Sequence, residues 1–171
     1  MRFLLLSIAI LCCCLPAFSQ DTRPLFPKRN AFYVEAMGKG PYYSVNYDRI
    51  IRVRTKWSYS FRVGVSLVAD GWSVPLGIHA FTTPGNHHLE LGLGVTPYVD
   101  HYRTFLSKND RSDKYLYVVP SVGYRYQKPE GGLFFTAGLA PYIFLDPPST
   151  DVFDVTPSYK LWAGVAVGFS F

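Results

Sequence analysis

Cysteine is nearly missing from this sequence, and its placement excludes several kinds of site. The 171 residues include three cysteines, which lie together at Cys12, Cys13 and Cys14 inside an apolar N-terminal run. If this run is removed on export, the rest of the chain can form neither a disulfide nor a thiolate metal site. A lipid anchor on one of these cysteines is the alternative, although Leu11 is larger than the residue that usually precedes a lipid-modified cysteine.

Long apolar runs and strong charge are lacking as well. Although 49% of the residues are hydrophobic, no stretch after residue 20 approaches the roughly eighteen apolar residues that a transmembrane helix requires. Charged residues make up 17% of the chain, the formal net charge is +5, and no long basic run occurs. Nucleic-acid binding therefore has no support. The length suits a single domain.

The N-terminus has the pattern of a secretory signal peptide. Arg2 precedes an apolar run, residues 3–15, that is too short to cross a bilayer as a helix. Ala17 and Ser19 are small residues at the −3 and −1 positions of a cleavage site after Ser19. We expect a signal peptide for Sec export over 1–19, a short periplasmic segment over 20–30, and a folded barrel domain over 31–171.

Alternation between apolar residues and small or polar residues is the dominant pattern after residue 30. The last segment shows it well, because every second residue from Leu161 to Phe171 is apolar. A period of two predicts β-strands, and the 3.6-residue period of amphipathic helices is not seen. Eight such segments occur, over about 31–38, 42–52, 56–68, 72–82, 87–99, 115–127, 132–144 and 159–171.

The content of the two strand faces indicates a barrel that spans a membrane. A soluble barrel should carry Lys and Glu on its water-facing side, but the less apolar side here is mostly Gly, Ser, Thr and Asn, which suits a narrow interior. Aromatic residues on the apolar side collect near strand ends, as in the girdles at membrane interfaces. The girdle residues that we single out are Trp57, Tyr59, Trp72, Tyr124, Tyr126 and Tyr159. The sequence thus predicts an all-β, eight-stranded antiparallel up-and-down transmembrane β-barrel. The alternative is a soluble β-sandwich in which the aromatic residues form the core.

With its signal peptide, eight amphipathic strands and a last strand that ends in Phe169, Ser170 and Phe171, the chain resembles the small outer-membrane barrels of the OmpX and OmpA-barrel type. The resemblance is one of architecture, and it extends to barrel families without an assigned activity. In such barrels the barrel-assembly machinery reads a terminal Phe, so the resemblance implies that role for Phe169 and Phe171. It also implies a place in the outer membrane of a Gram-negative bacterium, in contact with outer-membrane lipids.

Two connections between the expected strands are longer than the others. Residues 100–114 are rich in charge, and residues 145–158 contain Pro147 and Pro148. Both connections follow an odd-numbered strand. Outer-membrane barrels have short periplasmic turns and longer external loops, so we expect these two connections to lie outside the cell.

Few charged residues fall on the side that we assign to the interior. Because residues paired across a hairpin have a constant sum of residue numbers, each can be given an expected neighbour. The expected pairs are Glu35 with Asp48, Asp48 with Arg62, Arg62 with His79, His79 with Glu90, and Glu90 with Arg125. Buried charges are tolerated when paired, and an eight-stranded barrel is just wide enough for side chains to fill. We interpret the six residues as an ion-pair network that plugs the interior, with a gate or proton-linked pathway as the alternative.

No catalytic constellation stands out. Some eight-stranded outer-membrane barrels are lipid A acyltransferases or deacylases, which need a nucleophile with a base and an orienting group. Asp100, His101 and Ser107 are the one set that could supply them. His87 and His88 fall in an expected turn, and adjacent imidazoles on a strand point apart, which favours a solvated pair over a metal site.

We therefore expect no enzyme activity, no cofactor and no metal. The expected role is structural or one of surface interaction, through the external loops 100–114 and 145–158, with a surface partner that the sequence does not identify. A lipid A-modifying enzyme is the alternative from a different class.

Overall fold

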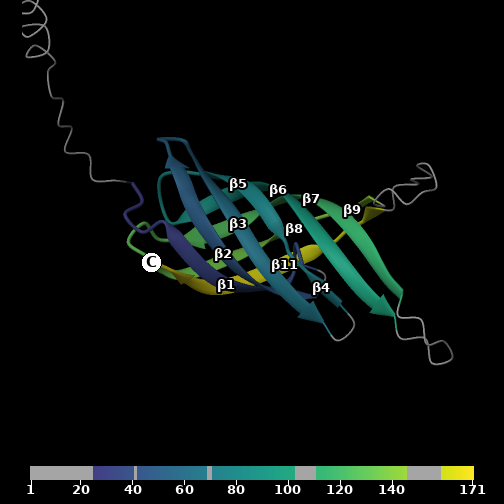
Figure 1. The fold of residues 1–171 in the computed structure, drawn as a ribbon. Coiled ribbons are helices and arrows are strands. Elements are labelled where there is room, and N and C mark those ends of the chain that lie inside the picture. The colour runs from purple at the N-terminus through teal and green to yellow at the C-terminus, as the bar shows by residue number, and fades with distance from the viewer. Residues whose placement is uncertain (1–24, 41, 69–70, 103–110, 146–158) are drawn as a thin grey trace, which may run out of the picture.

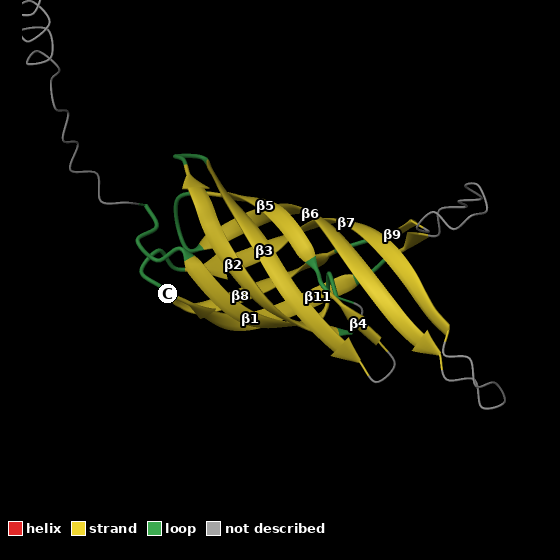
Figure 2. Cartoon of the chain, viewed as in Figure 1, coloured by secondary structure: helices red, strands yellow, loops and turns green. Residues whose placement is uncertain are grey.

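In a computed structural model, which describes residues 25–40, 42–68, 71–102, 111–145 and 159–171, the chain forms one sheet that closes on itself (Figures 1 and 2). Its strands are β1 (Asn30–Met37), β2 (Tyr43–Val53), β3 (Trp57–Val68), β4 (Gly71–Ser73), β5 (Leu76–Thr82), β6 (His87–Tyr102), β7 (Arg111–Gln127), β8 (Gly132–Leu139), β9 (Tyr142–Leu145), β10 (Tyr159–Lys160) and β11 (Ala163–Ser170). Over these ranges the chain has no helix, and hence none long and apolar enough to cross a membrane.

The eleven segments make eight barrel strands, because three barrel strands are each interrupted once. β4 continues into β5, β8 into β9, and β10 into β11. Pro75 and Pro141 lie at the first two interruptions, where the proline ring removes the N–H group that the ladder needs. Each barrel strand pairs antiparallel with the next, and β1 pairs with β11, so no sheet edge stays open. The predicted fold class is confirmed.

The expected strand ranges agree with these barrel strands except around the fifth and sixth. β6 continues to Tyr102 and β7 already begins at Arg111, so the connection expected over 100–114 is reduced to 103–110. Asp100 lies opposite Asp113 and His101 opposite Ser112 in this extension. Backbone pairing does not require apolar side chains, so charged residues can continue a strand. The charged residues at the two ends of 100–114 were therefore assigned to the connection although they belong to β6 and β7. Residues 1–24, 103–110 and 146–158 lie outside the described residues, and with them most of the expected signal peptide, N-terminal segment and loops.

The barrel has two distinct ends. We call the end that carries the connections 54–56, 83–86 and 128–131 the turn end, and the described chain both starts and finishes there (Figure 1). We call the opposite end, where β1, β3, β6 and β9 finish, the loop end. The connections at the turn end are short, as the sequence predicted.

Burial alternates along the strands as the predicted faces require. On β3, Ser60 and Arg62 are buried, whereas Val65 and Leu67 are 47% and 61% exposed. The same holds for β2 and β11, where Asp48 and Ser170 are buried. The small and polar side therefore faces inward and the apolar side faces outward, which confirms that assignment.

Gly168 of β11 lies at the tightest point of the seam that closes the barrel. It pairs with Tyr33 of β1, whose ring stacks on Phe134 at a centroid distance of 4.7 Å inside the barrel. A Cβ atom at Gly168 would overlap the Phe32 carbonyl oxygen and the Tyr33 side chain. Glycine at this position thus allows β1 and β11 to approach each other.

We expect Gly168→Val to hinder closure of the barrel, because a branched side chain would push β1 away from β11. The folded fraction on unheated gels and the urea midpoint of unfolding should both fall. Val167→Leu, a change at the adjacent outward-facing residue, is the control and should fold like the wild type. Normal folding of Gly168→Val would show that the seam has a different register.

Candidate functional site inside the barrel

Arg125 of β7 is the centre of a buried charged cluster in the middle of the barrel. Its guanidinium donates to Asp48 Oδ1 at 2.8 Å and to Glu90 Oε2 at 2.9 Å. Its Nε donates to Gln127 Oε1 at 2.9 Å. The Cζ atom lies 4.4 Å and 4.8 Å from the ring centroids of Phe81 and Phe134, so the cation contacts two aromatic rings. These contacts hold Arg125 in one position.

A second arginine forms a separate pair nearer the loop end. Arg62 of β3 binds Glu35 of β1 through two parallel hydrogen bonds, Nη1 to Oε1 at 3.1 Å and Nη2 to Oε2 at 2.8 Å. Such fork-to-fork pairing is the strongest common geometry between a guanidinium and a carboxylate. Glu35 Oε2 also accepts the backbone N–H of Lys39 at 3.1 Å.

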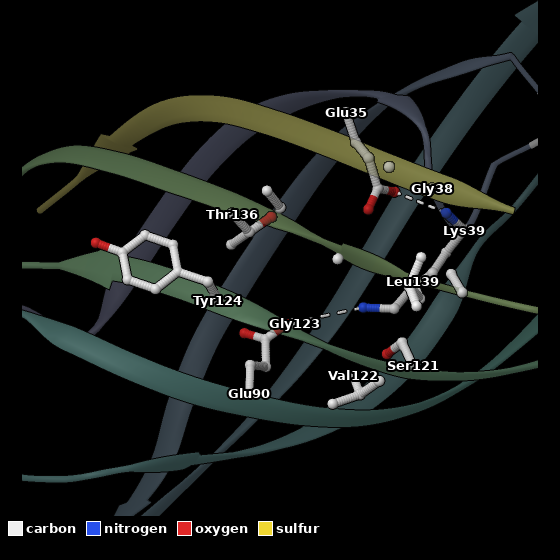
Figure 3. Close-up of a pocket in the computed structure, with 14 residues that line it drawn as sticks. Glu35, Gly38, Lys39, Glu90, Ser121, Val122, Gly123, Tyr124, Thr136 and Leu139 are labelled. Carbon is white, nitrogen blue, oxygen red and sulfur yellow. Dashed lines mark hydrogen bonds and ion pairs between the residues drawn. The ribbon is translucent and has the colours of Figure 1, made fainter.

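Lys39 and His79 connect the two arginine clusters. Lys39 Nζ lies 2.6 Å from His79 Nε2 and 3.9 Å from Glu90 Oε1, while His79 Nδ1 lies 3.5 Å from Asp48 Oδ2. Figure 3 shows Lys39 between Glu35 and Glu90. A neutral His79 with its proton on Nδ1 can accept from the Lys39 ammonium and turn an N–H toward Asp48. The cluster then holds three carboxylates and three cations.

The strand register differs from the expected one in four of the five pairs. Asp48 does lie opposite Arg62. The other four expectations are wrong: Glu35 lies opposite Ser44, Arg62 opposite Gly77, His79 opposite Gly92, and Glu90 opposite Gly123. In these four hairpins the centre of the turn lies one or two residues from the expected one, which shifts the pairing by two or four positions. The bulge between Ile50 and Arg52 lies in the fifth hairpin and leaves Asp48 opposite Arg62.

The ion pairs follow the register only in part. Arg62 bonds to Glu35 and not to Asp48, although Asp48 is its neighbour in the ladder. Glu90 and Arg125 form an ion pair even though they lie two positions apart in register. Long guanidinium side chains reach diagonal neighbours across strands, so the partner in the ladder need not be the partner in the ion pair.

Lys39 was missed by the sequence reasoning, because it lies in the connection after β1 and not in a strand. Met37 has a φ of 58°, and Gly38, Lys39 and Gly40 then turn into the barrel and are buried. A Cβ at Gly38 would overlap the Glu35 carboxylate. Glycine on both sides of a lysine was the available signal, but the same pattern is typical of an exposed turn.

The turn end of the interior is closed by apolar contacts that include the N-terminal segment. Phe26 is 1% exposed and packs against Ile50 and Phe81, with its ring 5.8 Å from that of Phe81. Next to it, His88 is buried and its Nε2 lies 3.1 Å from the Gln127 carbonyl oxygen. The expectation of a solvated His87 and His88 pair in a turn is therefore wrong for His88, which faces inward at the start of β6.

The loop end of the interior holds a group of aromatic residues. Successive rings contact one another at centroid distances from 5.3 to 6.4 Å; they are Tyr98, Tyr115, Tyr117, Tyr142, Phe144 and Trp162. The Tyr142 hydroxyl lies 2.7 Å and 2.9 Å from the carbonyl oxygens of Gly38 and Gly40. These contacts tie the connection after β1 to β9, two barrel strands away.

A small cavity remains between the loop-end contacts and the charged cluster. It measures about 30 Å³, and its lining includes Glu35, Lys39, Glu90 and Ser121 (Figure 3). This volume suits one or two water molecules.

The other residues singled out from the sequence lie on the outer wall or beyond the described side chains. Tyr59, Trp72 and Tyr124 are 40%, 43% and 39% exposed, and Trp57 and Tyr126 are half-buried. Phe169 and Phe171 are exposed at the turn end. Tyr159 lies in β10, but its side chain is outside the described part, as are those of Asp100 and His101, and Ser107 falls in a segment that the structure does not describe. Within the described ranges, no group of three or more His, Cys, Asp or Glu side chains could hold a metal ion.

A closed barrel with an apolar wall and a charged interior defines the class of fold: a small eight-stranded up-and-down β-barrel. No family model matches the sequence, and no curated protein is significantly similar to it. Among solved structures, the fold is similar to the N-terminal β-barrel domain of Pseudomonas aeruginosa OprF, with a TM-score of 0.54 and 16% sequence identity. The match covers 84% of this chain and 99% of that one.

We expect the Glu35 and Arg62 pair to be strongly coupled. Glu35→Gln or Arg62→Met alone leaves a buried charge without its partner, at a cost of about 3–5 kcal/mol, whereas the double change removes both charges. The double variant should therefore regain most of the lost resistance to urea unfolding. Glu90→Gln with Arg125→Met should regain less, because Asp48 then loses Arg125 as well. Additive losses in the first cycle would contradict the bidentate pair.

Proposed function

We propose that this chain is an integral outer-membrane β-barrel protein whose interior is closed to diffusion and whose role is structural or lies in surface interaction. The single observation that carries the proposal is the exposed apolar wall around the barrel. Outward-facing residues exposed by 40% or more include Phe32, Val34, Leu67, Ile78, Leu91, Leu93, Val165 and Val167. They come from β1, β3, β5, β6 and β11, and Ile51 of β2, Val122 of β7 and Leu133 of β8 are exposed in the same way, so the apolar surface surrounds the barrel.

A wall of this kind favours lipid over water as its surroundings. Soluble monomers rarely expose continuous apolar surface over more than a few hundred Å². A lipid bilayer in turn accepts only structures that satisfy all backbone hydrogen bonds internally, and a closed barrel does so. The short connections at the turn end support a periplasmic location for that end. Export through the Sec pathway and assembly by the barrel-assembly machinery, with Phe171 as its signal, belong to the same proposal.

A closed interior is supported by contacts at three levels. Phe26 and its neighbours fill the turn end, the two arginine clusters cross the middle, and Lys39 with the aromatic group fills the loop end. The cavity left between them is of water size. Such packing supports a plug and not a diffusion pore.

The contribution of the loops is proposed from the sequence. The connections 103–110 and 146–158 are the longest, and their positions after β6 and β9 place them at the loop end, which faces outward in this orientation. The alternative, a lipid A-modifying enzyme that uses His101, has no supporting geometry among the described side chains. Shortening the 103–110 segment and assaying lipid A acylation separates the two: loss of an acyl modification would favour the enzyme.

Membrane insertion is tested by fractionation. The protein expressed with its signal peptide should be recovered with the outer membrane, and its apparent mass on gels should differ between unheated and boiled samples because the closed barrel resists detergent. Recovery as a soluble periplasmic protein would contradict the proposal.

The closed interior is tested by transport. Liposomes that contain the wild-type protein should swell in a small sugar no faster than protein-free liposomes, with a general porin as positive control. Glu35→Ser combined with Arg62→Ser removes one level of the packing, and the rate should stay at that of protein-free liposomes because the turn-end contacts, the Arg125 cluster and the loop-end contacts remain. Rapid swelling with the wild type would show an open path.

A further inference from the structure

The outer wall carries a groove near the turn end that is unlike the rest of its surface. The groove has a volume of about 600 Å³ and lies over β3, β5 and β6 beside the end of β2. Its apolar sides include Ile51, Tyr59, Ile78, Leu91 and Leu93.

A small side chain explains why the wall is hollow here. Ala80 of β5 points outward, since its neighbours His79 and Phe81 are buried. It pairs with Tyr59 on one side and with Leu91 on the other. The larger side chains of Tyr59 and Leu91 on the flanking strands therefore project farther from the barrel than Ala80 does. The result is a groove over Ala80 with an apolar lining.

Two arginines stand at the rim of this groove because the β2 strand contains a bulge. The register shifts between Ile50 and Arg52, so that Ile50 is buried while Ile51 and Arg52 are both exposed. Arg54 follows, also exposed, and its backbone is held by hydrogen bonds to Trp57 and Thr83. Among the described residues, neither guanidinium is ion-paired with a carboxylate.

We propose that this groove binds one glycerophospholipid with an anionic headgroup, with its phosphate between Arg52 and Arg54 and one acyl chain over Ala80. Guanidinium groups match phosphate oxygens with paired hydrogen bonds, and basic pockets at a membrane surface recognise lipid headgroups. The apolar sides of the groove suit an acyl chain. Their aliphatic side chains offer no hydrogen-bonding group to a soluble anion, so they favour a lipid over a free phosphate. The site rests on the proposed function, which places the turn end at the inner leaflet.

The test uses the full mature protein in nanodiscs of phosphatidylcholine with a minor fraction of phosphatidylglycerol, followed by native mass spectrometry. A one-to-one adduct with phosphatidylglycerol is expected. Arg52→Gln with Arg54→Gln should weaken the adduct by at least tenfold, since each lost charge-assisted hydrogen bond is worth roughly that factor. Ala80→Leu, which fills the groove and leaves the charges in place, should weaken it as well.

Lys56→Gln with Lys128→Gln is the matched control, because it removes two positive charges from the same end of the barrel without touching the groove. This variant should keep the adduct. An equal loss in the control would show diffuse charge attraction and overturn the site. Three further results would also overturn the site. They are an Ala80→Leu variant that binds like wild type, binding of phosphatidylcholine equal to that of phosphatidylglycerol, and competition by free glycerol phosphate at the same concentration.

The gel shift between unheated and boiled samples separates this proposal from the proposed function. A barrel that inserts into the nanodisc and shows the shift but carries no adduct overturns the lipid site alone. A protein that does not enter the bilayer overturns the membrane proposal itself.

Discussion

Charge neutrality in a narrow space is the constraint on which the interior of this barrel depends. Glu35, Asp48 and Glu90 are buried together with Lys39, Arg62 and Arg125, so the formal charges cancel when His79 is neutral. A buried charge without a partner is strongly destabilising, which means that each of these residues depends on the presence of the others.

This constraint accounts for features outside the strands. Three carboxylates face two arginines on the strands, and the third cation comes from Lys39 in the connection after β1. The chain must turn inward to deliver it, and the left-handed Met37 followed by Gly38 allows the turn. The same inward turn meets the Tyr142 hydroxyl, so charge balance and closure of the loop end rest on one short segment.

The outer wall follows from the same alternation and changes character where the alternation breaks. Along most strands every inward polar residue is flanked by outward apolar ones, which gives a uniform lipid-compatible surface. The bulge after Ile50 places Ile51 and Arg52 on the same outer side. One inserted residue therefore converts the edge of an apolar wall into a basic rim above a groove.

The sequence by itself determined the strands, their two faces and the charged residues that the strands carry into the interior, because all three depend on a local period of two. Lys39 lies in the connection after β1, where this period does not apply, and only the tertiary structure placed it in the interior. Ser60 and Arg62 face inward as soon as their strand exists, whatever its neighbours do. Only the tertiary structure decided which residues contact each other. Arg62 pairs with Glu35, Arg125 pairs with both Asp48 and Glu90, and Phe26 packs against Ile50 and Phe81 at the turn end. Turns whose centres differ from the expected ones shift the register of each hairpin, and long side chains then reach diagonal neighbours. Partners in the interior are thus set by the geometry of the whole sheet and not by any single hairpin.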